Sequence, residues 1–211
     1  MTMKIMTQEL EWGAPLEPLE RADTIVLHHS AGSGSLKQVH DYHRYVNGWS
    51  GIAYHLYVRR DGTVWRGRPI DARGAHCRGW NGRSTGICFE GNFDAEKMSE
   101  PQLAAGREAV RYVLSIYPGA KIVGHGELCA TACPGKYFPL AELKEVGKAV
   151  KNEDACPDWA KREYERAAAL GITDGTKPTD CTPRYQAAVM ALRAAEAAVK
   201  MMKEELGHEN G

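Results

Sequence analysis

Short apolar runs that alternate with helical patterns dominate the first two-thirds of this 211-residue chain. The run 24–29 leads into a Gly/Ser loop, and two β-rich runs within 51–69 meet at Asp61-Gly62, a strong hairpin signal. Further strand-like runs cover 84–93 and 120–124. Because helical patterns separate these runs, the sequence predicts an α/β domain with one central mixed β-sheet flanked by helices.

Three helices are predicted around this sheet. The first begins after Ser35 and ends near Asn47-Gly48. The second begins at a capping box formed by Ser99 and Gln102, and Pro118-Gly119 ends it. One face of the second helix carries residues at helical spacing, namely Leu103, Gly106, Val110, Val113, Leu114 and Tyr117. A third helix is expected within 138–150, where it closes the domain.

The sequence turns polar over 146–156, which we interpret as a linker between two domains, residues 1–148 and 149–211. The second is predicted to be a small α-helical C-terminal domain with helices at 158–170 and 182–202. So short a helix pair buries too little apolar surface to be stable alone. We therefore expect a homo-oligomer that associates through these C-terminal helices.

The charge balance argues against a polyanionic partner. The chain carries 27 basic and 27 acidic residues, so it has no net positive charge for nucleic acid or an anionic membrane. Its start lacks the apolar core of a signal peptide, and no stretch approaches the roughly 18 apolar residues of a membrane span. We therefore expect no nucleic-acid partner, no membrane partner, and synthesis in the cytoplasm without an export signal.

Six cysteines in such a chain favour reduced thiols or metal ligation over a disulfide framework. They are Cys77, Cys88, Cys129, Cys133, Cys156 and Cys181. A late-formed bridge between Cys156 and Cys181 stays an open alternative.

The stretch 122–137, IVGHGELCATACPGKY, places metal-ligating residue types beside a Pro-Gly break. Imidazole and thiolate are favoured zinc ligands, and a catalytic zinc site takes three protein ligands. The candidates in this stretch are His125, Cys129 and Cys133. A further ligand is expected from His28 or His29, at the end of the strand 24–29. Because side chains alternate along a strand, only one of the two should reach the metal, and the pattern does not say which.

Four motifs occur in the order and spacing of a known family. They are IVLHHSAG, GIAYHLYVRRDGTVWRGRP, GAHCRGWNGRSTGICFEGNF and IVGHGELCATACPGKY. Together they resemble the zinc N-acetylmuramoyl-L-alanine amidases, which include phage lysozyme-type endolysins and peptidoglycan recognition proteins. The resemblance covers about residues 22–140. It implies the fold of that family and a zinc ion held by His28, His125 and Cys133, with Cys129 a packed bystander.

Copper is the other metal that this set of ligands could bind. A blue-copper site also uses two histidines, a cysteine and a methionine. Its methionine normally stands close to the cysteine in sequence, whereas the first methionine after Cys133 is Met190. Zinc is therefore the predicted cofactor.

The resemblance also implies catalytic roles for Tyr54, Thr131 and His76. Tyr54 matches a tyrosine near the scissile carbonyl, although an aromatic residue at strand spacing is usually core packing. Thr131 stands where lysozyme-type members carry lysine and many catalytic recognition proteins carry threonine. His76 matches a position that lines the cleft. The residues expected to contact substrate are His29, Trp80 and Asn81. Glu90 either serves the site or pairs with a nearby arginine.

These implications predict a peptidoglycan hydrolase. It would use zinc-activated water to cleave the amide bond between N-acetylmuramic acid and L-alanine, as a phage or prophage endolysin. Such an enzyme is made in the host cytoplasm and acts on the bacterial cell wall after release. The alternatives are a recognition protein that binds peptidoglycan without cleaving it, a bacterial autolysin with the same chemistry, and a structural protein of a phage tail or cell surface.

Part of the C-terminal domain resembles one surface-layer-homology repeat. The similarity rests on Trp159, the turn 171–175, Pro178 and Arg184. It implies binding to a secondary cell-wall polymer, and a plain dimerising helix hairpin is the alternative.

Overall fold

The computed structural model of the protein describes residues 4–19, 21–153, 165–167, 169, 191–192, 195 and 199. The chain divides into two compact units, residues 1–149 and 150–211. In the described ranges, no helix combines the length and the apolar character that crossing a bilayer requires. The first unit contains the β-sheet and all the predicted site residues.

The described residues up to Glu153 form six strands, three α-helices and two short helical turns. The strands are β1 (Ile5–Met6), β2 (Thr24–His29), β3 (Leu56–Val58), β4 (Val64–Arg66), β5 (Ser84–Phe89) and β6 (Lys121–Gly124). The helices are α1 (Leu36–Asp41), α2 (Glu100–Ile116) and α3 (Leu140–Glu153). A π-helical turn, η1 (Tyr42–Val46), continues α1, and a 3-10 turn, η2 (His125–Glu127), follows β6.

The six strands form one sheet in the order β1-β4-β3-β5-β2-β6. β2 lies between β5 and β6 and runs parallel to both, whereas β3 and β4 are antiparallel. The predicted central mixed sheet is therefore confirmed. The turn between β3 and β4 falls at Asp61-Gly62, where Gly62 has a φ of 85°, a conformation that residues with a Cβ rarely adopt.

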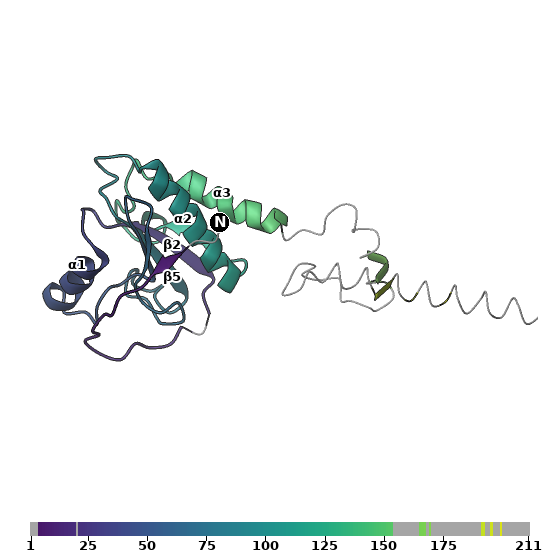
Figure 1. The fold of residues 1–211 in the computed structure, drawn as a ribbon, viewed down its shortest axis with the longest axis horizontal. Coiled ribbons are helices and arrows are strands. Elements are labelled where there is room, and N and C mark those ends of the chain that lie inside the picture. The colour runs from purple at the N-terminus through teal and green to yellow at the C-terminus, as the bar shows by residue number, and fades with distance from the viewer. Residues whose placement is uncertain are drawn as a thin grey trace, which may run out of the picture. The chain divides into compact units, whose positions relative to one another are not determined.

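Helices cover both faces of this sheet. Figure 1 shows α2 and α3 on one side of it and α1 on the other. On the α2 side, Phe89 of β5 lies against Gly106 of α2, and Ile122 of β6 lies against Gly147 of α3. The buried cluster on the α1 side consists of Leu36, Ile52, Tyr57 and Cys88. All six residues of β2 are buried because both of its faces are covered.

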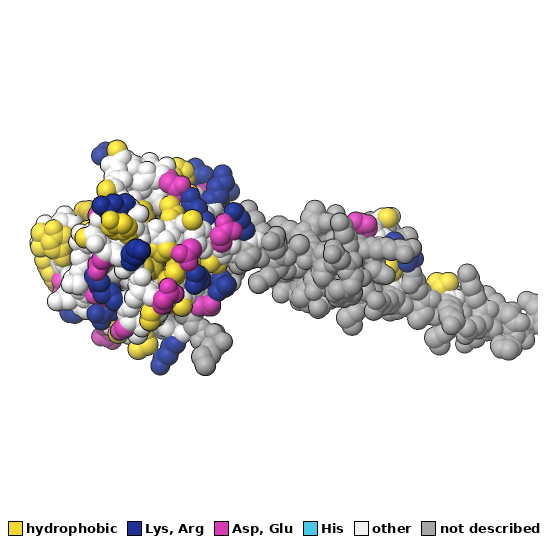
Figure 2. Space-filling view, turned by 90° about the horizontal axis from the view of Figure 1, so that it is seen from above, with side chains coloured by type: hydrophobic (Ala, Val, Ile, Leu, Met, Phe, Trp, Pro, Cys, Tyr) yellow, Lys and Arg dark blue, Asp and Glu magenta, His cyan; other side chains and the backbone are white. Residues whose placement is uncertain are grey.

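Charges of both signs are interspersed on the surface of the first unit. Figure 2 shows basic and acidic side chains mixed over the face that it presents. Exposed ion pairs join loops that are distant in sequence, for example Arg60 with Glu96 and Arg83 with Asp23. Each such pair contributes little to stability because water screens it. The mixture accords with the zero net charge of the chain.

The capping box lies at a different helix from the one predicted. At α1, Ser35 accepts from the Gln38 backbone N–H, and the Gln38 side chain accepts from the Ser35 N–H. At α2, Ser99 accepts from the Gln102 N–H, but the Gln102 amide donates instead to the Val58 carbonyl at 3.1 Å. Gln102 is buried and ties α2 to the sheet, so only half of the predicted box forms there.

One segment boundary and one strand also differ from the prediction. The polar stretch 146–156 was expected to be linker, yet α3 continues to Glu153. The helix continues because this stretch contains no glycine or proline between Lys148 and Glu153 to end it. The two-residue strand β1 was not predicted, since so short a strand shows no alternation.

The predictions for the C-terminal domain fall mostly outside the described residues. Within the two predicted helices, residues 165–167, 169, 191–192, 195 and 199 are described, and they are helical. The repeat-like motif and the alternative bridge between Cys156 and Cys181 lie outside the described residues.

Replacing Gly106 by alanine tests the packing of α2 on the sheet. A Cβ at this position would lie 2.5 Å from Cε1 of Phe89, whose side chain is fully buried. Glycine to alanine inside a helix ordinarily stabilises by about 1 kcal/mol. Here we expect Gly106→Ala to lower the free energy of unfolding by about 1–3 kcal/mol through overpacking, measured by urea denaturation.

The matched control is Gly147→Ala in α3. Its Cβ would lie 2.8 Å from the terminal Cδ1 of Ile122, which can rotate away, and at an ordinary 3.8 Å from Cγ1. This variant should therefore be less destabilised than Gly106→Ala. A Gly106→Ala protein more stable than the wild type would contradict the packing.

Candidate metal site and adjoining cleft

Two imidazoles and a thiol converge at the carboxyl end of β2. His28 is the second-to-last residue of that strand, and β2 pairs with β6 as far as Leu27 opposite Gly124. His125 directly follows β6, so the rings of His28 and His125 lie side by side, with centroids 4.5 Å apart. The donor atoms of His28, His125 and Cys133 all lie within 4.8 Å of one another. The structure thus brings together the three residues predicted as ligands.

The chemistry and spacing of these donors suit zinc. Cys133 Sγ lies 3.7 Å from His28 Nδ1, close to the roughly 3.6 Å that tetrahedral ligation with ordinary Zn–S and Zn–N bonds requires. Burial, reinforced by His76 and His125, lowers the pKa of His28 well below its usual value, so its imidazole is neutral. Burial raises the pKa of Cys133 to about 11, against the effect of the His29 backbone. A bound cation would stabilise the thiolate form.

His76 supports His28 from behind. Its Nδ1 lies 3.0 Å from His28 Nε2, the nitrogen that faces away from Cys133. The His76 ring is buried between the backbones of Gly74 and Gly86, where a Cβ would approach it to 2.5 and 2.6 Å. The side-chain oxygen of Asn81 accepts the His76 backbone N–H at 2.8 Å. A hydrogen bond such as the one between His28 and His76 fixes the orientation of a ligand imidazole.

The loop that carries His125 and Cys133 is closed by its own hydrogen bonds. The Gly126 N–H donates to the Cys133 carbonyl at 2.7 Å. The hydroxyl oxygen of Thr131 accepts from the Cys133 N–H at 3.2 Å, and the Thr131 residue is exposed. Glu127 accepts from the backbone at the end of β6 and pairs with a lysine of α3. These bonds hold His125 and Cys133 at a fixed separation.

Tyr54 lies between these donors and an open cleft. It precedes β3, and its ring centroid is 5.1 Å from that of His28. Burial raises the pKa of Tyr54 well above its usual value, and the thiols of Cys88 and Cys133 add to this. The phenol therefore keeps its proton at neutral pH and can donate a hydrogen bond. The cleft has a volume of about 300 Å³ and is lined by loop 30–34, α1, η1 and Tyr54.

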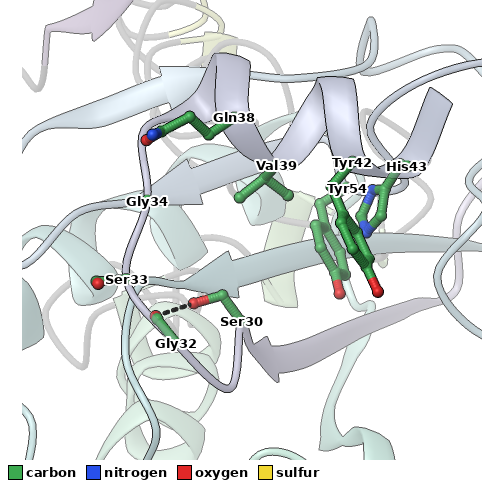
Figure 3. A pocket seen from close by; sticks show the side chains of 9 residues that line it. All are labelled: Ser30, Gly32, Ser33, Gly34, Gln38, Val39, Tyr42, His43 and Tyr54. Carbon is green, nitrogen blue, oxygen red and sulfur yellow. Dashed lines mark hydrogen bonds between the residues drawn. The ribbon is translucent and has the colours of Figure 1, made fainter. Parts of the chain in front are cut away.

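Two residues of the cleft's aromatic wall, Tyr42 and His43, were missed by the sequence analysis. Figure 3 shows Tyr42 and Tyr54 with their hydroxyl groups pointing the same way and His43 next to them. Tyr42 is 57% exposed, and Tyr45 and Trp49 are also exposed nearby in the chain. Burial lowers the pKa of His43 to about 4, so this ring is neutral. The available signal was the aromatic-rich run YHRYVNGW, which we interpreted only as part of a helix.

His29 and Trp80 lie in different surroundings. Since side chains alternate along β2, His29 faces the α2 side of the sheet, where its Nδ1 accepts the Phe93 N–H at 3.2 Å. The rings of His29 and Phe93 are stacked with centroids 6.2 Å apart. Trp80 is half-buried, and the Arg83 guanidinium lies 5.1 Å above its ring. None of the three predicted substrate-contacting residues, His29, Trp80 and Asn81, lines the cleft. Asn81 lines a separate hollow.

Glu90 belongs to the scaffold around the site. It accepts from the Arg59 side chain at 3.0 Å and from the Gly34 and Arg60 backbone N–H groups at 3.1 and 3.2 Å. Burial raises its pKa, but these donors outweigh burial and lower the pKa of Glu90 below its usual value. Of the two alternatives left open for this carboxylate, pairing with an arginine is the one that the structure contains.

The fold and donor set define a mixed α/β domain with a candidate metal centre at the end of its central parallel strand. Residues 18–136 match the family described as N-acetylmuramoyl-L-alanine amidase, and this match spans more than half of the chain. The protein therefore belongs to that family.

Similar proteins agree with this assignment. The chain is 34% identical to the endolysin of Enterobacteria phage K11 over 56% of its own length and 80% of the phage protein. It is 33% identical to peptidoglycan-recognition protein SC2 of Drosophila simulans over 52% of its own length and 66% of that protein. The solved structure of N-acetylmuramoyl-L-alanine amidase LysC from Clostridium intestinale URNW superposes with a TM-score of 0.66, at 36% identity, over 72% of this chain and 99% of that one.

Gly126→Ala should weaken metal binding without removing a donor. A Cβ at this position would lie 2.7 Å from the Thr131 carbonyl oxygen and 3.0 Å from that of Cys133, so the loop must shift. We expect zinc affinity, measured by competition with a chromophoric chelator, to fall about 10–100-fold, as when a ligand loses its support. Gly82→Ala, whose Cβ would meet only Arg73 Nε at 4.0 Å, is the control. Unchanged affinity in Gly126→Ala would contradict the role given to this loop.

Proposed function

We propose that the protein is a zinc-dependent N-acetylmuramoyl-L-alanine amidase that hydrolyses the amide bond between N-acetylmuramic acid and L-alanine in peptidoglycan. The observation that carries this proposal is the convergence of His28, His125 and Cys133 donor atoms, within 4.8 Å of one another, close to the Tyr54 wall of a cleft. Membership of the amidase family and the similarity to an endolysin and a solved amidase support it.

His28, His125 and Cys133 would hold the zinc. Zinc supplies Lewis acidity and lowers the pKa of a water molecule to about 7, which makes a nucleophile available at neutral pH. For His28 to ligate through Nδ1, its Nε2 must carry the hydrogen and donate it to His76 Nδ1, 3.0 Å away. His76 therefore acts by selecting one tautomer of His28.

Tyr54 would donate its phenolic hydrogen to the oxyanion that develops on the scissile carbonyl. Its raised pKa keeps this hydrogen in place at neutral pH. Thr131 is a neutral hydroxyl on the exposed loop, so it offers a weaker donor than the lysine of lysozyme-type members. Transition-state stabilisation would therefore depend mainly on the metal and Tyr54.

The cleft would hold the muropeptide. Its loop 30–34 offers backbone polar groups, and the aromatic side chains of Tyr42 and Tyr54 offer flat apolar surface. Trp80 would contact substrate from a neighbouring loop, while Asn81 contributes through the backbone groups that it holds. His29 would not contact the substrate, because its ring faces the other side of the sheet. It would be only a neighbour of the proposed ligands.

A phage or prophage endolysin is the biological role that we propose. In that role the enzyme is made in the host cytoplasm and reaches the peptidoglycan after release. The C-terminal unit would bind a secondary cell-wall polymer and associate into an oligomer. Because the chain is also similar to a recognition protein, the alternative function is that of a protein that binds muropeptide without cutting it. The cysteine and tyrosine beside the two histidines favour the enzyme over that rival.

The first test is release of new N-terminal alanine from purified peptidoglycan. Wild-type protein should be active, chelation should remove the activity, and added zinc should restore it. Cys133→Ser should reduce activity to background and lower the bound zinc. Cys129→Ser, a matched change in the same loop that leaves the three proposed ligands intact, should stay active under reducing conditions. Zinc-loaded wild type that binds several wall types and releases nothing would leave the recognition protein as the better description.

Tyr54→Phe tests the proposed hydrogen-bond donor without changing the proposed zinc ligands. The substitution keeps the ring that packs beside His28 and removes only the hydroxyl. We expect kcat to fall about 10²–10³-fold, the usual cost of losing one oxyanion donor, with zinc content and KM little changed. Full activity in this variant would assign the oxyanion contact to another group.

A further inference from the structure

Two thiols outside the proposed ligand set touch each other. The sulfur atoms of Cys77 and Cys129 lie 3.3 Å apart, and both cysteines are free. A disulfide bond is about 2.05 Å long, so a small movement of the two side chains would join them. Cys77 follows His76 in one loop, and Cys129 lies between His125 and Cys133 in another. The pair therefore connects the two loops that position the candidate metal site.

Backbone hydrogen bonds hold both cysteines in this arrangement. The Cys77 N–H donates to the Asn81 side chain at 2.8 Å, and its carbonyl accepts from the Trp80 N–H at 3.0 Å. The Cys129 N–H donates to the His125 carbonyl at 3.1 Å. Because both backbones are fixed, the two sulfur atoms stay together, and little entropy remains to be lost when they join.

The same two thiols also form a second metal-binding arrangement. Donor atoms of Cys77, His125 and Cys129 lie within 4.8 Å of one another, so His125 belongs to two overlapping donor sets. A thiol-seeking cation could thus be held either with His28 and Cys133 or with the cysteine pair. Only the first of these sets adjoins Tyr54 and the cleft.

We propose that Cys77 and Cys129 form a disulfide when the protein meets a low-molecular-weight disulfide, and that this bond leaves His125 with a single donor set. The bond also ties the His76 loop to the His125 loop. Formation of this disulfide does not require amidase activity, so it can be tested independently of the proposed function.

The two cysteines have different parts in the exchange. Cys77 is 2% exposed, whereas Cys129 is only partly buried, so Cys129 is the sulfur that an external disulfide can reach. After losing its proton, Cys129 attacks one sulfur of the small disulfide and releases one small thiol. Cys77 then attacks the Cys129 sulfur and releases the second small thiol. Overall, the two protein thiols lose two protons and two electrons, and the small disulfide is reduced to two thiols.

The test uses the full-length, zinc-loaded protein carrying Cys156→Ser and Cys181→Ser, which leaves four cysteines. The protein is equilibrated with glutathione disulfide, its remaining thiols are alkylated, and its intact mass and tryptic peptides are measured. We expect two thiols to escape alkylation and the peptides 74–78 and 122–136 to be linked. Fragment ions should place the link at Cys129 and not at Cys133, and dithiothreitol should reverse it.

Variants and a second measurement make the result decisive. Cys77→Ala and Cys129→Ser should each abolish the link, whereas Cys88→Ala, a buried cysteine elsewhere in the sheet, should retain it. The oxidised protein should melt about 5 °C or more above the reduced protein, because the bond closes a loop between residues 52 apart. Oxidised protein should bind one zinc per chain.

Three outcomes would overturn the proposal. All four thiols could remain alkylatable after equilibration with excess glutathione disulfide. The link could instead join Cys129 to Cys133 or Cys77 to Cys133. The reduced protein could bind two zinc ions per chain with Cys77 and Cys129 protected from the oxidant, which would make the pair a second metal site.

Discussion

Parallel pairing of β2 with both β5 and β6 is the constraint on which the rest of this structure depends. It aligns the carboxyl ends of three strands, so His28 emerges beside the start of the loop that carries His125 and Cys133. Helices cover both faces of the sheet (Figure 1) and bury β2, so the imidazole of His28 lies in a medium where an unpaired polar group is costly. The hydrogen bond to His76 offsets the free-energy cost of burying the His28 imidazole and also orients its ring.

Several glycines around the site leave room for the side chains of the candidate ligands and of His76. Gly74 and Gly86 allow two backbone segments to pack against the His76 ring, and Gly126 allows the loop that carries His125 and Cys133 to fold back on itself. Asn81 holds the loop that begins at His76. A chain with the same ligands but bulkier residues at these glycine positions could not bring the donors to this separation.

The strands, the hairpin and α2 could be predicted because local periodicity and turn residues determine them. The choice between His28 and His29 could not be made from alternation, since a strand buried on both faces has no polar side to mark its orientation. The resemblance selected His28, and the structure places that residue with the other two donors. Ser99 followed by Gln102 was interpreted as a capping box, but tertiary packing drew the Gln102 side chain to the sheet. The contact of Cys77 with Cys129 joins distant loops, and no local pattern encodes it.

His28 and His29 are consecutive residues that face opposite sides of one strand. His28 faces the other two candidate metal ligands, whereas His29 packs on Phe93 and accepts its backbone N–H. β2 therefore separates the candidate metal site from the hydrophobic core on the α2 side, and a shift on either side reaches the other across a single peptide unit. During divergence of such a domain, substitutions behind the sheet and substitutions around the candidate metal site would have to be compatible with each other. The two halves of the domain are thus expected to evolve together.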